Sequence, residues 1–229
     1  MKVAVLYSGG KDSNYALHWA FTKGFEVTCL ITLKARHEDS WMFHVPNIEI
    51  TKLQAKALNL PQIFLETSGK RDEELIDMKR AFIEARENYG IEGVVTGALL
   101  SDYQRMNINI VAHEVHLRTY SPLWRKDQER YMLELVDYGF KIVITSIDTY
   151  GLSPKYLGKV LTRSDVLEII DLARKYGFNP AFEGGEAETL VVDAPLFRKE
   201  LNIKCSRVVK VHEYSWRLVI EDVELRDKC

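Results

Sequence analysis

The first cluster of residues able to do chemistry is the run Ser8-Gly9-Gly10-Lys11-Asp12-Ser13. It follows an apolar run at 3–6 and precedes a segment at 15–21 with apolar residues at helical spacing, so a buried strand is expected to turn sharply into a helix. Such a turn collects backbone N–H groups and the positive end of a helix, which favours a bound phosphate. Lys11 adds a cation. The carboxylate of Asp12 would repel a phosphate and therefore indicates Mg²⁺ or a reaction step.

The spacing of this run differs from the Walker pattern, which has four residues between its first glycine and Gly-Lys. Two glycines alone would fit an ordinary strand-to-helix turn with a serine cap. The complete string, directly after the first strand, favours another interpretation. It resembles the pyrophosphate loop of the ATP pyrophosphatase (PP-loop) superfamily, whose members split ATP into AMP and pyrophosphate while adenylating a substrate.

The second candidate cluster is the acidic run 183–189, Glu-Gly-Gly-Glu-Ala-Glu-Thr. Carboxylates this close together repel one another unless cations or water separate them. The run fits an acidic turn in solvent. It fits equally a cup of carboxylates for Mg²⁺, for ammonium or for a positively charged substrate.

The first half of the chain must position the Ser8 loop, and it alternates strand and helix patterns. Strands are expected at 3–6, 25–32, 62–66 and 93–97, and helices at 15–21, 48–59, 72–89 and from Ser101 to about 117. Such alternation predicts an α/β domain of the Rossmann-like, HUP-like type, with a parallel sheet covered on both faces. Ligands of such sheets lie beyond the carboxyl ends of the strands, where the Ser8 loop and Gly97 are expected to meet.

A long apolar connection at 34–46 interrupts this alternation and contains Trp41 and His44. Such a loop either packs against the domain or covers a ligand. His44 is a candidate ligand-binding group, and a structural histidine is the alternative.

The second half of the chain reads as a smaller α+β region. Helices are expected at 127–138, after Ser153-Pro154, and from a cap at Ser164-Asp165 to Tyr176; strands are expected at 141–147 and in a hairpin at 203–212 and 216–225. The polar segment at 125–128 is a candidate hinge. The predicted domains are therefore 1–124, which binds ATP, and 125–229, which binds the substrate.

Composition limits the classes of partner. The chain has 229 residues, 46% of them hydrophobic, and a net charge of -2, which disfavours nucleic acid as the main ligand. Its three cysteines are scattered and indicate neither a zinc cage nor a disulfide framework. His113 and His116 lie one helical turn apart, and a solvated helix face is preferred to a metal site. Without a signal peptide or a run long enough to span a bilayer, the protein is expected to be cytoplasmic.

Further motifs narrow the resemblance from a superfamily to a family. They are 40–44 (Ser-Trp-Met-Phe-His), Thr96-Gly97-Ala98, 101–105 (Ser-Asp-Tyr-Gln-Arg), Pro122-Leu123-Trp124, Gly151-Leu152, Leu157-Gly158, the acidic run 183–189 and 193–197 (Asp-Ala-Pro-Leu-Phe). Together they resemble the diphthine:ammonia ligase (diphthamide synthase) family over nearly the whole chain. The resemblance implies ATP-dependent amidation of diphthine, a modified histidine of elongation factor 2, with ammonium as the nitrogen source. Diphthine carries a trimethylammonium group, which an acidic cup would suit.

Two departures from the family pattern bear on the substrate pocket. After Arg105 the family commonly has further arginine, glutamate and cysteine residues, whereas this helix has Met106, Asn107, Asn109 and Ala112. Ala187 stands where the family tends to have an aromatic residue. A paralogue acting on another carboxylate is therefore an alternative.

The mechanism expected from this resemblance has two steps: a substrate carboxylate attacks ATP to give an acyl adenylate and pyrophosphate, and ammonia then displaces AMP. The resemblance implies catalytic roles for Lys11, Asp12, Glu183 and Glu186; ATP binding by Ser8, Gly9, Gly10, Lys11, Ser13 and Gly97; Mg²⁺ binding by Asp12; and substrate binding by His44, Asp102, Tyr103, Gln104, Arg105, Glu183, Gly184, Gly185, Glu186, Glu188 and Thr189. The rivals are a PP-loop ligase with a small-molecule carboxylate and a regulator that binds ATP or AMP without turnover. A homo-oligomer is left open.

Overall fold

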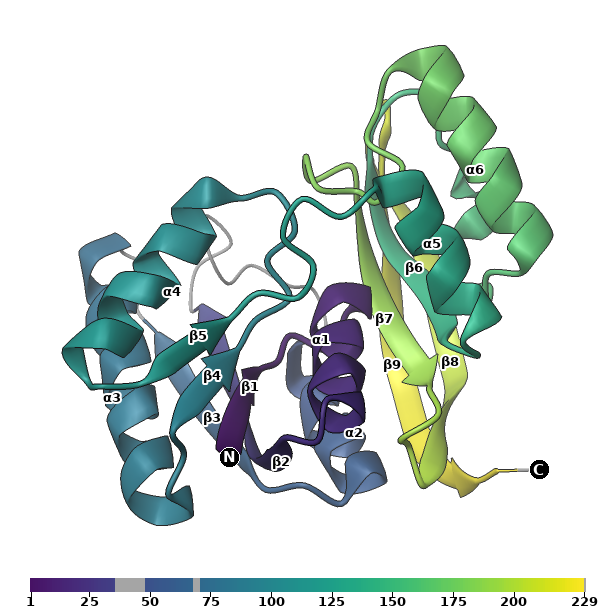
Figure 1. Ribbon diagram of the computed structural model, residues 1–229. Coiled ribbons are helices and arrows are strands. Elements are labelled where there is room, and N and C mark those ends of the chain that lie inside the picture. The colour runs from purple at the N-terminus through teal and green to yellow at the C-terminus, as the bar shows by residue number, and fades with distance from the viewer. Residues whose placement is uncertain (36–47, 68–70, 229) are drawn as a thin grey trace. The chain divides into compact units, whose positions relative to one another are not determined.

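The structure is a computed structural model that describes residues 1–35, 48–67 and 71–228. Its contacts divide the chain into two compact units (Figure 1). The first unit comprises Met1–Ser8 and Asp12–Arg125, and the second comprises Gly9–Lys11 and Lys126–Cys229. Three residues of the glycine-rich loop are thus grouped with the second unit.

A five-stranded parallel sheet forms the centre of the first unit. Its strands are β1 (Lys2–Leu6), β2 (Glu26–Ala35), β3 (Gln62–Thr67), β4 (Gly93–Val95) and β5 (Arg118–Tyr120), in the order β3-β2-β1-β4-β5. Every neighbouring pair is parallel. This order and direction are typical of a Rossmann-like fold, so the predicted fold class of this unit is confirmed. The sequence analysis missed β5, which has only three residues.

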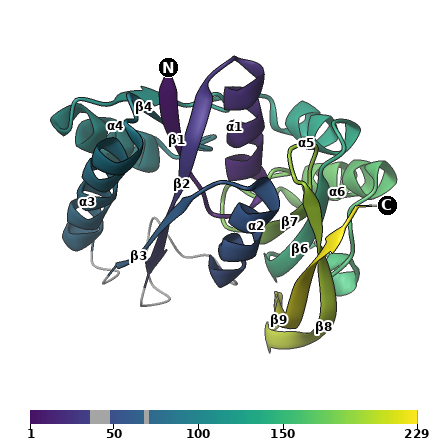
Figure 2. The same ribbon diagram turned by 90° about the horizontal axis from the view of Figure 1, so that it is seen from below.

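Helices cover both faces of this sheet, as expected for parallel strands. They are α1 (Lys11–Thr22), α2 (Thr51–Leu58) after the 3₁₀ turn η1 (Ile48–Ile50), α3 (Arg71–Tyr89) and α4 (Asp102–Glu114). The helices α1 and α2 lie on one face of the sheet, and α3 and α4 lie on the other (Figures 1 and 2). Buried Ile31 and Val94 of the sheet, Met78 and Phe82 of α3, and Val111 of α4 belong to one apolar core, which anchors α3 and α4 to the strands.

The second unit contains a four-stranded antiparallel sheet and two helices. Its strands are β6 (Lys141–Asp148), β7 (Ala187–Asp193), β8 (Lys199–His212) and β9 (Ser215–Asp227), in the order β7-β6-β9-β8, and its helices are α5 (Gln128–Asp137), α6 (Arg163–Tyr176) and the 3₁₀ turn η2 (Pro154–Tyr156). Both α5 and α6 lie on the same side of the sheet (Figure 1). The prediction of an α+β region with a terminal hairpin is confirmed. The sequence analysis did not predict β7 as a strand.

The helix α6 begins with a capping box. Thr162 is the N-cap, its side chain accepts a hydrogen bond from the N–H of Asp165, and the Asp165 carboxylate accepts one from the N–H of Thr162. The predicted cap at Ser164 is therefore wrong, although the predicted end at Tyr176 is confirmed, with Gly177 in the left-handed conformation at φ 81°. Lys159 also donates to Asp165, over 2.6 Å. Burial opposes ionisation of Asp165, but the bonds from Lys159 and Thr162 lower its pKa to about 2.

We expect Asp165→Asn to lower the free energy of unfolding by about 2 kcal/mol at pH 7, because the folded pKa lies below the ordinary value of 3.8. A depressed folded pKa stabilises the protein above pH 3.8, and that stabilisation is lost as the pH falls towards 2. Urea unfolding of wild type and variant between pH 7 and pH 2.5 checks this. Asp171→Asn, on the exposed face of the same helix, is the control; a gap between wild type and Asp165→Asn that stays constant with pH would contradict the prediction.

None of the helices in the described ranges is long and apolar enough to cross a membrane.

Candidate active site

The glycine-rich loop connects the end of β1 to the start of α1. Gly9 has a φ of 82°, a left-handed conformation that glycine adopts without strain. The helix α1 begins directly afterwards at Lys11, so Asp12 lies in its first turn. The Ser8 hydroxyl lies 3.3 Å from the Ser13 hydroxyl, on the two sides of the turn. The predicted strand, turn and helix are thus present, with both hydroxyls together at the positive end of α1.

Gly97 lies directly against the start of α1. A Cβ atom at Gly97 would lie 2.7 Å from the carbonyl carbon of Asp12, 2.8 Å from its oxygen and 2.9 Å from the nitrogen of Ser13. These distances are too short for any side chain, and all three atoms belong to the backbone. Because Gly97 has no side chain, the segment after β4 can pack against the backbone of the first turn of α1.

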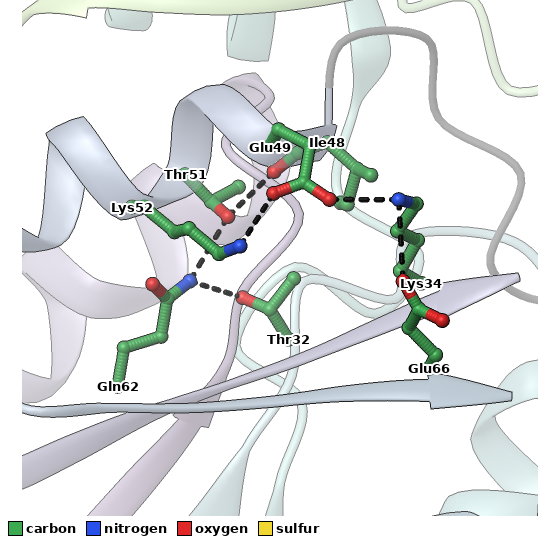
Figure 3. A network of polar contacts seen from close by, with 8 residues as sticks. All are labelled: Thr32, Lys34, Ile48, Glu49, Thr51, Lys52, Gln62 and Glu66. Atoms are coloured by element: carbon green, nitrogen blue, oxygen red, sulfur yellow. Dashed lines mark hydrogen bonds and ion pairs between the residues drawn. The ribbon is translucent and has the colours of Figure 1, made fainter.

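A network of polar contacts lies beside the entry to the loop, and Figure 3 shows its residues Thr32, Thr51 and Gln62. The Thr32 hydroxyl of β2 donates to the carbonyl oxygen of Tyr7, the last residue before Ser8, over 2.6 Å. The Gln62 amide of β3 donates to Thr32 over 2.8 Å and to Thr51 of α2 over 2.9 Å. The side chains of three elements thus hold the carbonyl group that leads into the loop.

A chain of ion pairs lies at the same end of the sheet (Figure 3). Lys34 donates to Glu49 over 2.7 Å and to Glu66 over 3.4 Å, and Glu49 also accepts from Lys52. The hydrogen bonds from Lys34 and Lys52 lower the pKa of Glu49. These side chains are partly or largely exposed, so the pairs orient the ends of β2 and β3 more than they stabilise the fold.

We expect Thr32→Val to lower the free energy of unfolding by about 1–3 kcal/mol, because it deletes a buried hydroxyl and leaves the Gln62 amide and the Tyr7 carbonyl each without one partner. Urea denaturation measures the loss. Thr28→Val on the same strand is the matched control, since the Thr28 hydroxyl lies 3.5 Å from its acceptor and its loss should cost much less. Equal stability of the two variants would contradict the role given to the network.

Within the second unit, Gly9–Lys11 contact β7 and the acidic run. The N–H of Val191 donates to the carbonyl oxygen of Gly9 over 3.0 Å, and the N–H of Lys11 donates to the Thr189 hydroxyl over 3.2 Å. The Lys11 ammonium group lies 4.0 Å from a carboxylate oxygen of Glu183, and only 3% of the residue is exposed. The buried ammonium group of Lys11 and the carboxylate of Glu183 are therefore close enough to attract each other.

The acidic run folds as a tight turn held by Glu186. One Glu186 carboxylate oxygen accepts from the N–H of Asn179 over 2.9 Å, and the other accepts from the N–H of Gly184 over 2.8 Å. Phe182 has a φ of 64°, which is unusual for a bulky residue, and is 5% exposed. Glu186 thus shapes the turn that carries Glu183. Strain of this kind is typical of functional segments.

Glu188 and Thr189 lie on β7, outside that turn. The N–H of Glu188 donates to the Ser146 hydroxyl of β6 over 3.2 Å. Within the turn, Gly185 has a φ of 83°, and β7 begins after Glu186 at Ala187. The six predicted residues of the acidic run therefore divide into a turn, which includes Glu183 and Glu186, and a strand, which includes Glu188 and Thr189.

The start of α4 carries the other predicted substrate residues. Ser101 is the N-cap, as predicted, and its hydroxyl accepts from the N–H of Gln104. The Arg105 guanidinium lies 3.5 Å from Asp102 and 4.3 Å above the Trp124 ring. Its buried Nε has no hydrogen-bond partner among the described residues. Tyr103 is partly buried beside Asp102 in the first turn, and Arg105 is held by a neighbouring carboxylate and an aromatic face.

The similarity of this chain to known proteins covers nearly all of these elements. A family model described as the diphthamide synthase N-terminal domain matches residues 1–119, and one described as the diphthamide synthase C-terminal domain matches residues 127–225. The chain belongs to the diphthamide synthase family. Members named diphthine–ammonia ligase include a human protein, 32% identical over 91% of this chain and 85% of its own length. One from Schizosaccharomyces pombe is 33% identical over 92% of this chain and 37% of its own.

Among solved structures, a predicted tRNA methyltransferase subunit from Methanocaldococcus jannaschii matches 85% of this chain and 98% of its own. Its identity is 18% and its TM-score 0.45, too low to bear on function. The resemblance to the diphthamide synthase family is confirmed by the family models and the curated relatives, and membership makes the protein a ligase.

The predicted His44 lies outside the described residues. No group of three or more histidine, cysteine, aspartate or glutamate residues in the described ranges is arranged to hold a metal ion. Asp12 as a magnesium ligand therefore stays a prediction, since Mg²⁺ would need oxygens of a nucleotide beside it.

Sequence reasoning missed several residues that shape the glycine-rich loop and the acidic turn of this chain. Thr32 is buried and Gln62 is partly buried on neighbouring strands, and a threonine within an apolar strand was the only available signal of their contact. Phe182 directly precedes the acidic run, and its left-handed backbone has no sequence signature. The contacts of these residues depend on where the folded chain places them, which is fixed only when segments distant in the sequence pack together.

Proposed function

We propose that this diphthamide synthase family member catalyses the ATP-dependent amidation of diphthine on elongation factor 2, with ammonium as the nitrogen source. The observation that carries the proposal is the contact between the glycine-rich loop and the acidic run, in which Lys11 lies 4.0 Å from Glu183. A cation suited to phosphates and a carboxylate suited to a cationic substrate are thus neighbours. The names of the curated relatives support the same reaction.

The reaction needs two displacements. An oxygen of the diphthine carboxylate attacks the α-phosphorus of ATP; the bond from this phosphorus to the bridging oxygen breaks, and pyrophosphate leaves with that electron pair. Ammonia then attacks the carbonyl carbon of the acyl adenylate, AMP leaves, and the nitrogen loses a proton to give the amide. No nucleophile from the protein is required, because ATP activates the carboxylate.

The loop residues suit the leaving pyrophosphate. Ser8 and Ser13 offer hydroxyl groups on the two sides of the turn, and Lys11 offers a buried ammonium group. Preorganised donors of this kind are most effective where negative charge develops. The close approach of Gly97 holds the segment after β4 against the first turn of α1, so Gly97 would flank a nucleotide bound at the loop. Asp12, in the first turn of α1, would hold Mg²⁺ together with phosphate oxygens.

The acidic residues suit the positive charges of the reaction. Glu183 would orient the trimethylammonium group of diphthine or an incoming ammonium ion, while Glu186 keeps the turn in place through Asn179 and Gly184. Arg105, stacked on Trp124, would contact the substrate carboxylate or a phosphate.

The test is product analysis with ATP, Mg²⁺ and ammonium, with and without elongation factor 2 bearing diphthine. We expect AMP and pyrophosphate only with that partner, together with the mass change from carboxylate to amide. AMP formation that ignores the partner would point to another, small-molecule carboxylate. ATP binding without turnover under both conditions would point to a nucleotide-binding regulator.

A further inference from the structure

Three tyrosines from separate segments of the second unit form an exposed aromatic cluster. Tyr150 follows β6, Tyr176 ends α6 and Tyr214 lies in the turn of the β8–β9 hairpin. The Tyr150 ring lies 5.2 Å from that of Tyr176 and 5.1 Å from that of Tyr214, both edge to face. Their exposed fractions are 59%, 37% and 44%. We call these three residues the tyrosine cluster.

The backbone at Gly151 leaves room for the ring of Tyr176. Gly151 has a φ of 93°, and a Cβ atom there would lie 2.4 Å from two ring carbons of Tyr176. A side chain at this position would push the Tyr176 ring away. The Gly151 backbone therefore allows a close approach that brings Tyr150 and Tyr176 together, although the rings gain little burial from it.

The tyrosine cluster is connected to the acidic turn through two short segments. The N–H of Asp148, two residues before Tyr150, donates to the carbonyl oxygen of Glu186 over 2.7 Å. The N–H of Asn179, three residues after Tyr176, donates to the Glu186 carboxylate over 2.9 Å. The segments that carry Tyr150 and Tyr176 are therefore both hydrogen-bonded to Glu186 of the acidic turn.

The charge at the Tyr214 end of the cluster favours a cationic partner. Lys175 already lies 4.9 Å from the centre of the Tyr176 ring. Asp148 is paired with Arg217, whereas Glu213 is exposed at the Tyr214 end, where its hydrogen bond and charge raise the pKa of Tyr214. The Tyr150 and Tyr214 end thus combines two aromatic faces with a carboxylate, which attracts a guanidinium or ammonium group and repels a phosphate.

We propose that the tyrosine cluster is a docking surface for an arginine- or lysine-bearing segment of the protein substrate. This inference rests on the proposed function only for the identity of that protein. The exposed rings form an open surface, which suits a side chain anchored in a polypeptide. The basic side chain would lie over Tyr150 and Tyr214 with Glu213 beside it.

The direct test is binding of a fluorescent hexa-arginine peptide, measured by anisotropy at low salt. We expect the double variant Tyr150→Ala with Tyr214→Ala to bind about 10-fold more weakly, because two cation–π contacts are lost. Tyr150→Phe with Tyr214→Phe keeps both rings and should bind within about twofold of wild type. Tyr138→Ala, which removes another tyrosine of the second unit that is 57% exposed, is the control for loss of an exposed ring.

Equal peptide binding by wild type and the double alanine variant, or no binding by wild type, would overturn the docking surface. A second assay uses elongation factor 2 bearing diphthine, where the double alanine variant should raise KM for that protein about 10-fold and leave kcat unchanged. If wild type does not amidate elongation factor 2, the proposed function fails and the peptide result still decides the inference. If wild type does so and KM is unaffected by the double alanine variant, the inference alone fails.

Discussion

Gly97→Ala should reduce kcat/KM for AMP formation at least about 100-fold, since a shift of about 1 Å at a catalytic site can cost that much. The added methyl group would lie 2.7–2.9 Å from backbone atoms of Asp12 and Ser13, and a helix backbone cannot move aside as a flexible side chain can. Either the segment after β4 or the start of α1 must shift. A shift of α1 would displace Lys11 and Ser13 from the geometry that suits a phosphate, and a shift of the segment after β4 would move Gly97 away from that turn.

The control for this variant is Gly90→Ala. Gly90 has a φ of 64°, and its added methyl group would meet only the Lys2 side chain, at 3.9 Å. Strain at a left-handed position should cost about 1 kcal/mol of stability and leave turnover unchanged. Thermal unfolding and initial rates measured on both variants separate a general loss of stability from damage to the loop. Normal turnover by Gly97→Ala would show that its position does not control the loop.

Local sequence patterns predicted most of the fold, because helix caps and apolar periodicity depend on residues that lie close together in the sequence. The alternation of apolar strands and amphipathic helices indicated the parallel sheet, and the cap at Ser101 followed from a short-range hydrogen bond. The short strand β5 gave no detectable periodicity. The strand β7 was missed because the acidic residues before it resemble a solvent loop, whereas its pairing with β6 depends on contacts between residues about 45 positions apart.

The features of the candidate site, too, could be predicted from the sequence only where they depend on neighbouring residues. The strand-to-helix turn from Ser8 to Ser13 could be predicted because an apolar run precedes its glycines and helical spacing follows them. The hydrogen bonds that Glu186 accepts from Asn179 and Gly184 could not be predicted, and its catalytic role stays a prediction. A sequence shows that a carboxylate is present, but it does not show whether that carboxylate is satisfied by the backbone or directed at a ligand.

Lys11→Met should lower kcat for AMP formation about 100- to 1000-fold, because it deletes the buried cation of the loop and keeps a side chain of similar length. Lys155→Met is the matched control, since it removes a lysine that is paired with Glu168 over 2.6 Å but largely exposed. Its activity should match that of wild type. A Lys11→Met enzyme with normal kcat would exclude electrostatic stabilisation of the leaving group by this residue.

The variant Glu183→Gln changes the neighbour of Lys11 and should affect KM for ATP and kcat for different reasons. Removing the carboxylate 4.0 Å from Lys11 frees the ammonium group to attract phosphates, so KM for ATP should fall. The same change removes the anion proposed for the cationic substrate, so kcat should fall as well. In the double variant with Lys11→Met, KM for ATP should no longer respond to Glu183→Gln, because the cation through which Glu183 acts is gone. If the effect of Glu183→Gln on that KM were the same with and without Lys11, the two side chains would be acting independently.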